Sequence, residues 1–309
     1  MKKIFKLILL FSLISTFSCT PLLRNIAEWD ARDYNKKLFT LDIENKKVKI
    51  IKREKKNTKY HDLIIFMGVT TFEKSYIPLY PHLKDMNIFV IHTPLHGYDE
   101  EMTTGKPIEN ADDLTNFQVK VVKELIKNKI TTSKVNILGY SMGGMTLINI
   151  LNKNLLDNEI ENAILVNTNR SNDAIKDKHN SQLIDKSLLE KKYDANFFLD
   201  KCYSDETPFH LKMLGTEAFF ATDEASLGDF SCVRDFERVA IEEKIKPINK
   251  KTLYIASEKD KIFYFTEAEK FSKNFSNVSF KKLGSGHISL LEKPSDFGNI
   301  IMNYLEKQK

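Results

Sequence analysis

The chain reads KVNILGYSMGGMTLINIL at residues 134–151. The mostly apolar segment at 135–138 is typical of a buried strand, and the apolar segment after Gly143 is typical of a buried helix. Between them, residues 139–143 form a G-x-S-x-G motif in the strand-to-helix context that this motif requires. The pattern predicts a sharp turn that lifts the Ser141 hydroxyl clear of a sheet.

The two glycines of this motif are needed for steric reasons. Ser141 at the tip of so sharp a turn needs a strained backbone, and a side chain at Gly139 or Gly143 would strike the neighbouring chain. With 11 glycines among 309 residues, the motif arises by chance with a probability of about 2%. The alternative interpretation is a glycine-rich turn that only packs.

Composition places the chain among folded globular proteins. Its 309 residues suffice for one large domain or for a domain with an insertion, and 42% apolar residues are ample for a core. The net charge is only +5, which confines any nucleic-acid footprint to a local patch. We therefore expect no nucleic-acid partner.

One local basic cluster occupies residues 46–59. Val48 and Ile50 alternate there with lysines, which predicts a half-buried strand with a solvated basic face. Contact with anionic lipid is the alternative.

Residues 1–19 have the plan of a signal peptide. Three lysines precede an apolar run at residues 7–14, and small and polar residues then lead to Cys19. The run is too short to span a bilayer comfortably. The Ser18-Cys19 pair resembles a bacterial lipoprotein processing site, so we expect an exported chain that a lipid on Cys19 anchors to a membrane of the cell envelope. Phe17 and Thr16 depart from the usual residues of such a site, which leaves ordinary cleavage or an uncleaved anchor as alternatives.

Cys202 and Cys232 remain as an even pair if Cys19 carries lipid. In an exported protein such a pair can form a disulfide. Two buried thiols are the other interpretation.

Predicted strands alternate with predicted helices over most of the chain. Residues 38–43 and 47–51 alternate in polarity about Glu44 and Asn45, which predicts an antiparallel hairpin. Further strands are predicted at 62–67, 88–91, 135–138, 163–166, 252–256 and 278–283. Helices are predicted before residue 84, over 110–126, after Ser141, from a capping box at Thr266 and Glu269, and over 299–305.

This alternation predicts an α/β fold with a mostly parallel sheet and helices on both faces. The expected core comprises residues 38–167 and 250–309. Residues 168–245 break the rhythm, because they are charged, rich in phenylalanine and without a strand pattern. We expect this insertion to be a helical lid or a separate module.

Three residues that follow different predicted strands can form a nucleophilic site. A serine hydroxyl is a weak nucleophile unless a base takes its proton and a third group orients that base. Ser141, Asp260 and His287 each follow a strand at the same edge of the sheet. Their order along the chain, Ser, Asp, His, is a known order of catalytic triads that include a G-x-S-x-G motif. Glu258 and Asp173 are alternatives for the acid.

Two other histidines, His92 and His96, also follow a strand at that edge. Turn histidines bonded to the backbone are the preferred interpretation of both. An oxyanion hole is expected to use the backbone N–H groups of Met142, directly after the serine, and of Val69, in the loop after the third strand.

The chain resembles the α/β-hydrolase superfamily, and within it the bacterial carboxylesterases and the monoacylglycerol-lipase-like serine hydrolases. The resemblance covers about residues 60–167 and 250–308. The residues that carry it are FMGVT at 66–70, PLHG at 94–97, GYSMGG at 139–144, SEKD at 257–260 and GH at 286–287. Two positions depart from the usual pattern: Met67 precedes Gly68 where histidine is usual, and Ser257 stands where glycine is usual.

This resemblance implies a serine hydrolase that cleaves carboxylic esters, in particular lipid or acyl esters, through an acyl-enzyme on Ser141. It implies no metal and no organic cofactor. The serine argues against haloalkane dehalogenases, epoxide hydrolases and dienelactone hydrolases, which carry another nucleophile. Thioesterases and peptidases share the triad and remain alternatives, as does a non-catalytic surface lipoprotein that has kept the fold.

Overall fold

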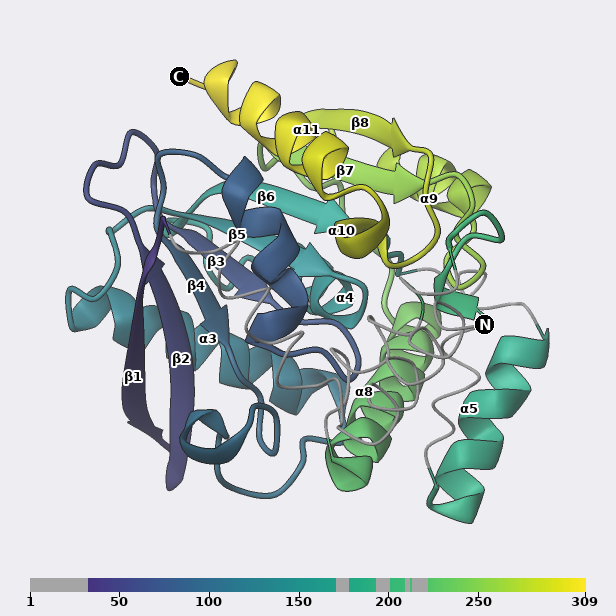
Figure 1. The fold of residues 1–309 in the computed structure, drawn as a ribbon. Coiled ribbons are helices and arrows are strands. Elements are labelled where there is room, and N and C mark those ends of the chain that lie inside the picture. Colours follow the sequence, from purple (N-terminus) through teal and green to yellow (C-terminus); the bar gives the residue numbers. More distant parts are fainter. Residues whose placement is uncertain (1–32, 171–177, 193–200, 209–211, 213–221) are drawn as a thin grey trace, which may run out of the picture.

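The computed structural model describes residues 33–170, 178–192, 201–208, 212 and 222–309. Within these residues the chain forms an eight-stranded sheet in the order β1-β2-β4-β3-β5-β6-β7-β8 (Figure 1). Its strands are β1 (Asn35–Ile43), β2 (Lys46–Glu54), β3 (Leu63–Phe66), β4 (Ile88–Ile91), β5 (Val135–Tyr140), β6 (Ile160–Val166), β7 (Thr252–Ser257) and β8 (Val278–Leu283). Strand β2 pairs antiparallel with β1 and β4, and the other neighbours pair parallel. The predicted α/β fold is confirmed.

The hairpin of β1 and β2 follows from its two turn residues. Glu44 and Asn45 have φ angles of 48° and 64°, and a two-residue turn with both φ angles positive matches the twist of antiparallel strands. The register then pairs Ile43 with Lys46, as the sequence predicts for a hairpin about these two residues.

Helices cover both faces of the sheet. Residues Leu63 and Ile65 of β3 face one layer, which contains the 3₁₀ helix η1 (Glu73–His82), α10 (Ser289–Glu292) and α11 (Pro294–Glu306). Ile64 and Phe66 face the other layer, which contains α3 (Ala111–Lys127), α4 (Met142–Asn152) and α9 (Phe265–Ser272). Alternate residues of a strand point to opposite faces, so a strand of continuous apolar residues is explained by two apolar layers.

The parallel strands end together at one edge of the sheet. Phe66 of β3 pairs with Gly139 of β5, Tyr140 pairs with Val166 of β6, and Ser257 of β7 pairs with Leu283 of β8. The loops that leave these strands are therefore neighbours. This is the edge at which open α/β sheets bind ligands.

Two helices differ from the sequence prediction. Helix η1 is a 3₁₀ helix with Pro78 and Pro81 inside it, and proline is poorly tolerated in the interior of an α-helix. Helix α9 begins at Phe265 with Tyr264 as its N-cap and has no side-chain cap, so the capping box predicted at Thr266 is wrong.

The described part of the insertion includes two helices, α5 (Lys178–Glu190) and α8 (Asp223–Glu242). Figure 1 shows both beyond the arrowheads of β5 and β6, and α8 contacts α3 and α4 while α5 contacts α8. A third apolar cluster joins them to the core, with Met142 and Met145 of α4 packed against Phe230 and Val233 of α8. The described part of the insertion thus lies at the carboxyl edge of the sheet.

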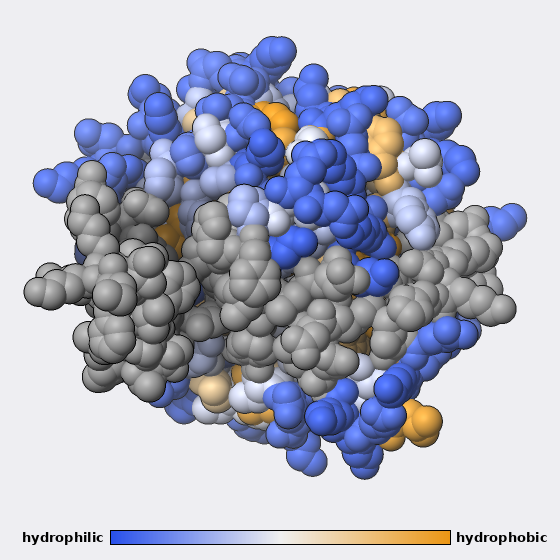
Figure 2. Space-filling view, turned by 45° about the vertical axis from the view of Figure 1, so that its right-hand side comes forward, coloured by the Kyte–Doolittle hydropathy of each residue, from blue (hydrophilic) through white to orange (hydrophobic). Residues whose placement is uncertain are grey.

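Hydrophilic side chains cover most of the described surface in the view of Figure 2. Among the described residues, the exposed large hydrophobic side chains are Leu38, Leu189 and Tyr264. None of the described helices combines the length and the apolar character needed to cross a bilayer.

Candidate active site

Ser141 occupies the turn between β5 and α4. Its φ of 52° lies in the left-handed region, which costs energy for a residue with a side chain. A Cβ atom on Gly143 would lie 2.1 Å from the carbonyl oxygen of Phe66, and a Cβ on Gly139 would lie 2.5 Å from the carbonyl oxygen of Gly143. Both glycines are required because backbone atoms fill the space that a side chain would need.

A hydrogen-bonded chain of three side chains begins at Ser141. Its Oγ lies 2.9 Å from Nε2 of His287, and Nδ1 of His287 lies 2.8 Å from Oδ2 of Asp260. The three residues are 6%, 5% and 6% exposed, respectively. In this arrangement Nδ1–H donates to the carboxylate and Nε2 is available as an acceptor for the serine proton.

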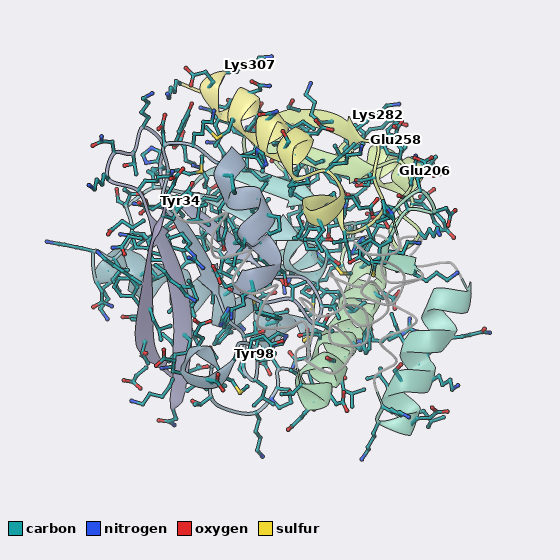
Figure 3. All side chains as sticks on the ribbon, in the orientation of Figure 1. Tyr34, Tyr98, Glu206, Glu258, Lys282 and Lys307 are labelled. Carbon is teal, nitrogen blue, oxygen red and sulfur yellow. The ribbon has the colours of Figure 1, made fainter. Side chains whose placement is uncertain are left out.

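Backbone donors hold the Asp260 carboxylate in place. Its Oδ1 accepts hydrogen bonds from the N–H groups of Ile262 and Phe263, at 2.7 and 2.9 Å, which leaves Oδ2 for His287. Glu258, the first alternative for the acid, is exposed, and its Oε1 lies 3.6 Å from Nζ of Lys282 on the surface (Figure 3). Asp173, the other alternative, lies outside the described residues.

Two polar side chains that the sequence did not single out hold the backbone of His287. The Tyr140 hydroxyl and Nδ2 of Asn167 donate to the His287 carbonyl oxygen, at 2.6 and 2.7 Å. Oδ1 of Asn167 also accepts from the N–H of Ser257, at the start of the loop that carries Asp260. Asn167 therefore links the histidine loop to the acid loop.

The carboxylate of Glu292, on α10, ties the histidine loop to the insertion. Its Oε1 accepts from the N–H of Gly286 at 3.0 Å and from the N–H of Ser204 at 3.2 Å. Its Oε2 accepts from the hydroxyls of Ser204 and Thr207. Residues 202–207 thus pack directly on the loop, and a Cβ on Gly286 would lie only 2.4 Å from the nitrogen of Ser204.

The predicted oxyanion donors Val69 and Met142 lie in segments adjacent to the serine. Met142 is the first residue of α4, whose first N–H groups have no acceptor within the helix. Val69 follows Gly68, where a Cβ would lie 3.2 Å from Cβ of Ser141. Within the described part of the chain, the N–H of Val69 has no hydrogen-bond acceptor.

His92 and His96 stand outside the Ser141, His287 and Asp260 chain. Both nitrogens of His92 bond to the backbone: Nε2 accepts from the N–H of Glu73 and Nδ1 donates to the carbonyl of Glu101. Burial lowers the pKa of His92 to about 4, so its ring is neutral near pH 7. This agrees with the interpretation of His92 as a turn histidine.

His96 agrees with that interpretation in part, since its Nδ1 lies 3.0 Å from the carbonyl oxygen of Pro94, but its Nε2 lies 3.0 Å from Oδ2 of Asp229 on α8. Burial alone would lower the pKa of His96, but the charge and hydrogen bond of Asp229 outweigh it and leave the pKa raised.

The two described cysteines are free and buried, so the disulfide interpretation is wrong and the two-thiol interpretation is confirmed. Cys232 lies on α8 with its Sγ 3.1 Å from the carbonyl oxygen of Ile108, and burial raises the pKa of both thiols. Among the described residues, no group of three His, Cys, Asp or Glu side chains could hold a metal ion. Cys19 lies outside the described residues.

Solved structures with this architecture include hydrolases of several kinds. A thermophilic esterase superposes with a TM-score of 0.67 at 18% identity and covers 89% of this chain and 99% of its own. A membrane phospholipase A described as a bacterial virulence factor superposes with a TM-score of 0.70 at 14% identity, and the match covers 100% of this chain and 99% of the phospholipase. A lipase-esterase related protein from Clostridium acetobutylicum ATCC 824 superposes with a TM-score of 0.67 at 15% identity, and the match covers 88% of this chain and 99% of that protein. At these identities the likeness shows the fold.

No curated protein matches the chain. The family model described as the alpha/beta hydrolase fold matches residues 68–294, which is well over half of the sequence. That span includes Ser141, Asp260 and His287. The chain therefore belongs to the α/β-hydrolase family.

Proposed function

We propose that this protein is a serine hydrolase that cleaves carboxylic esters, with Ser141 as nucleophile, His287 as general base and Asp260 as the acid that orients it. The observation that carries the proposal is the unbroken hydrogen-bonded chain from Oγ of Ser141 through His287 to Oδ2 of Asp260. A buried serine next to a correctly oriented imidazole has the geometry of an activated nucleophile.

The first half of the reaction forms an acyl-enzyme. Oγ of Ser141 attacks the carbonyl carbon of the ester while its proton passes to Nε2 of His287. The carbonyl oxygen becomes an oxyanion that accepts hydrogen bonds from the N–H groups of Met142 and Val69. When the intermediate collapses, the bond to the alcohol oxygen breaks, and that oxygen takes the proton from His287.

The second half releases the acid. Water attacks the acyl carbon and gives its proton to Nε2 of His287, and the same proton returns to Oγ of Ser141 as the ester bond to the enzyme breaks. Asp260 accepts the Nδ1–H bond throughout and stabilises the imidazolium that forms in each half. Two backbone N–H groups hold its carboxylate, so it keeps this orientation during both proton transfers.

Acyl esters of lipid type are the substrate class that we propose. The apolar cluster begins at Met142, directly after Ser141, and continues through Met145 to Phe230 on the insertion, with Val69 packed against it. An acyl chain on Ser141 would extend along apolar side chains of this kind. The fold neighbours described as an esterase, a phospholipase and a lipase-esterase related protein favour the same class.

We also propose that the protein works at a membrane surface of the cell envelope, to which lipid on Cys19 anchors it. The signal-like residues 1–19 carry this part of the proposal. An anchored enzyme would meet lipid esters at the same surface.

An acyl-length series tests the ester proposal, with purified protein and p-nitrophenyl esters from acetate to laurate. Burial of each CH₂ contributes about 0.8 kcal/mol, so kcat/KM should rise about fourfold per methylene until the apolar site is full. Ser141→Ala is the control and should be inactive on every ester. Preference for acetate, or cleavage of peptides or thioesters with no ester turnover, would contradict the proposed substrate class.

A further inference from the structure

Asp229 of α8 joins the insertion to two loops at the carboxyl edge of the sheet. Its Oδ2 accepts a hydrogen bond from the N–H of Thr70 at 2.8 Å and lies 3.0 Å from Nε2 of His96. All three residues are buried, with exposures of 5%, 1% and 2% for Asp229, Thr70 and His96. A buried carboxylate that contacts both the Val69 loop and a histidine has no role in the ester mechanism described above.

The segment that Asp229 contacts is a tight turn. The N–H of Thr71 donates to the carbonyl oxygen of Gly68 at 3.3 Å, which closes a four-residue turn with Val69 and Thr70 in the middle. Thr70 has a φ of 61°, whereas Val69 has a negative φ. This combination of φ angles is the one that a type II turn uses, and glycine is preferred at the third position of that turn.

A β-branched threonine is a poor residue for that position. Left-handed φ angles are strained for threonine, so the turn needs support from its surroundings. Turns of types I and II differ mainly in the orientation of the central peptide, and the N–H of that peptide here belongs to Thr70. The hydrogen bond to Asp229 therefore stabilises the type II orientation.

The same turn leaves a single donor of its loop unused. Gly68 donates to the Tyr76 hydroxyl, Thr70 to Asp229, and Thr71 to the carbonyl oxygen of Gly68. Within the described residues, the N–H of Val69 is the one in this turn without an acceptor. Without the bond from Asp229, the strained turn could relax and shift Val69, next to Ser141.

His96 fixes the other side of the carboxylate. Its Nδ1 lies 3.0 Å from the carbonyl oxygen of Pro94 and 2.8 Å from Oγ1 of Thr93, so a protonated ring can donate from both nitrogens. A positively charged ring and the Asp229 carboxylate form a charge-assisted hydrogen bond, which is stronger than a neutral one.

We propose that Asp229, braced by His96, is a positioning residue for the oxyanion hole: from the insertion it holds the Gly68–Thr71 turn in the conformation that presents the N–H of Val69 to the substrate. The inference rests on the proposed function. It makes the insertion part of the catalytic apparatus as well as a cover for the acyl chain.

Asp229→Ala tests this, with Asp235→Ala as a matched control. Asp235 lies on the same helix, and its Oδ2 also accepts a backbone N–H of the core, from Ala111 at 2.8 Å, but that residue starts α3 and is not part of the turn. Loss of one oxyanion donor costs about 10²–10³ in kcat, so a displaced donor should cost about 10–100-fold. We expect Asp229→Ala to lower kcat by this factor with KM nearly unchanged, and Asp235→Ala to keep kcat within about twofold.

Thr70→Gly provides a rescue that a purely structural role of Asp229 does not predict. Glycine adopts the positive φ without strain. The double variant Asp229→Ala, Thr70→Gly should therefore have a kcat about tenfold higher than that of Asp229→Ala alone. If Asp229→Ala does not fold, Asp229→Asn replaces it in the same comparison, because its neutral amide is a weaker acceptor. Equal kcat in the Asp229 and Asp235 variants, or no rescue by Thr70→Gly, overturns this inference alone. No turnover and no labelling of Ser141 in the wild type overturns the proposed function and this inference with it.

Discussion

The hydroxyl of Tyr140 donates a hydrogen bond of 2.6 Å to the carbonyl oxygen of His287. Tyr140 directly precedes Ser141, so the strand that presents the nucleophile also holds the loop that presents the base. Burial raises the pKa of Tyr140 well above its ordinary value, so the phenol stays protonated and able to donate. The distance between base and nucleophile therefore depends on a contact made by the residue next to the serine.

Tyr140→Phe should lower kcat by about three- to tenfold, because a net hydrogen bond contributes about 0.5–1.5 kcal/mol and Asn167 still donates to the same carbonyl oxygen. Tyr304→Phe is the control, since Tyr304 is a buried tyrosine of α11 whose hydroxyl approaches Asn162 instead. Steady-state kinetics on one ester measures both variants. An unchanged kcat in Tyr140→Phe, or an equal fall in Tyr304→Phe, would show that this contact does not position His287.

Asp260→Asn should lower kcat by about 10⁴, because the amide cannot hold the imidazole in the tautomer that leaves Nε2 as the acceptor. Glu258→Gln, two residues away, should keep near-normal activity because Glu258 lies on the surface beside Lys282. The pair is compared by kcat/KM at one pH. Near-normal activity of Asp260→Asn together with a loss in Glu258→Gln would assign the acid to Glu258. Near-normal activity of both variants would leave Asp173 as the candidate acid.

The stability of the protein should fall in acid through His92. Its folded pKa is about 4 and the ordinary value is 6.5, so the unfolded chain binds a proton that the folded chain excludes between these pH values. The free energy of unfolding should therefore decrease as the pH falls from 6.5 to 4, by about 3 kcal/mol at most for this group. Below pH 4 its contribution is constant.

His92→Gln removes this titration while keeping one acceptor and one donor. Urea unfolding of both proteins at several pH values should show a shallower slope in the variant over pH 6.5–4. His96 has a raised pKa and acts in the opposite sense, but it is present in both proteins and cancels in the comparison. Equal slopes in the two proteins would contradict a buried neutral His92.

Cys19→Ser should release the protein from membranes if the lipid anchor is present, since two or more acyl chains give stable attachment and one does not. The measurement is partition between detergent and aqueous phases after expression of the full chain in a bacterium. Mature wild-type protein with an unmodified amino terminus, read by mass spectrometry, would contradict the anchor.

The sequence predicts the sheet well, because continuous apolar runs and the hairpin residues Glu44 and Asn45 are local signals. It also places Ser141, Asp260 and His287 after strands at one edge, and parallel strands bring such positions together. The structure shows these three side chains in hydrogen-bond contact. Their catalytic roles stay predictions until activity is measured.

The supporting contacts could not be predicted from the sequence. Asn167, Glu292 and Asp229 are ordinary polar residues whose partners lie 85–159 positions away, apart from Gly286, which lies six positions from Glu292 across a loop, so no local spacing identifies them. The cap of α9 was predicted wrongly for a related reason, since Thr266 and Glu269 match a local pattern that the helix does not use.

Labelling with a fluorophosphonate probe is the most direct test that Ser141 is an activated nucleophile. The wild type should gain one adduct, mapped by peptide mass spectrometry to Ser141, and Ser141→Ala should gain none. His287→Ala should label far more slowly and lose turnover on the order of 10⁶, like the serine variant, because the two residues act as one unit. Equal labelling of the wild type and Ser141→Ala, or a folded wild type that does not react, would contradict the proposal.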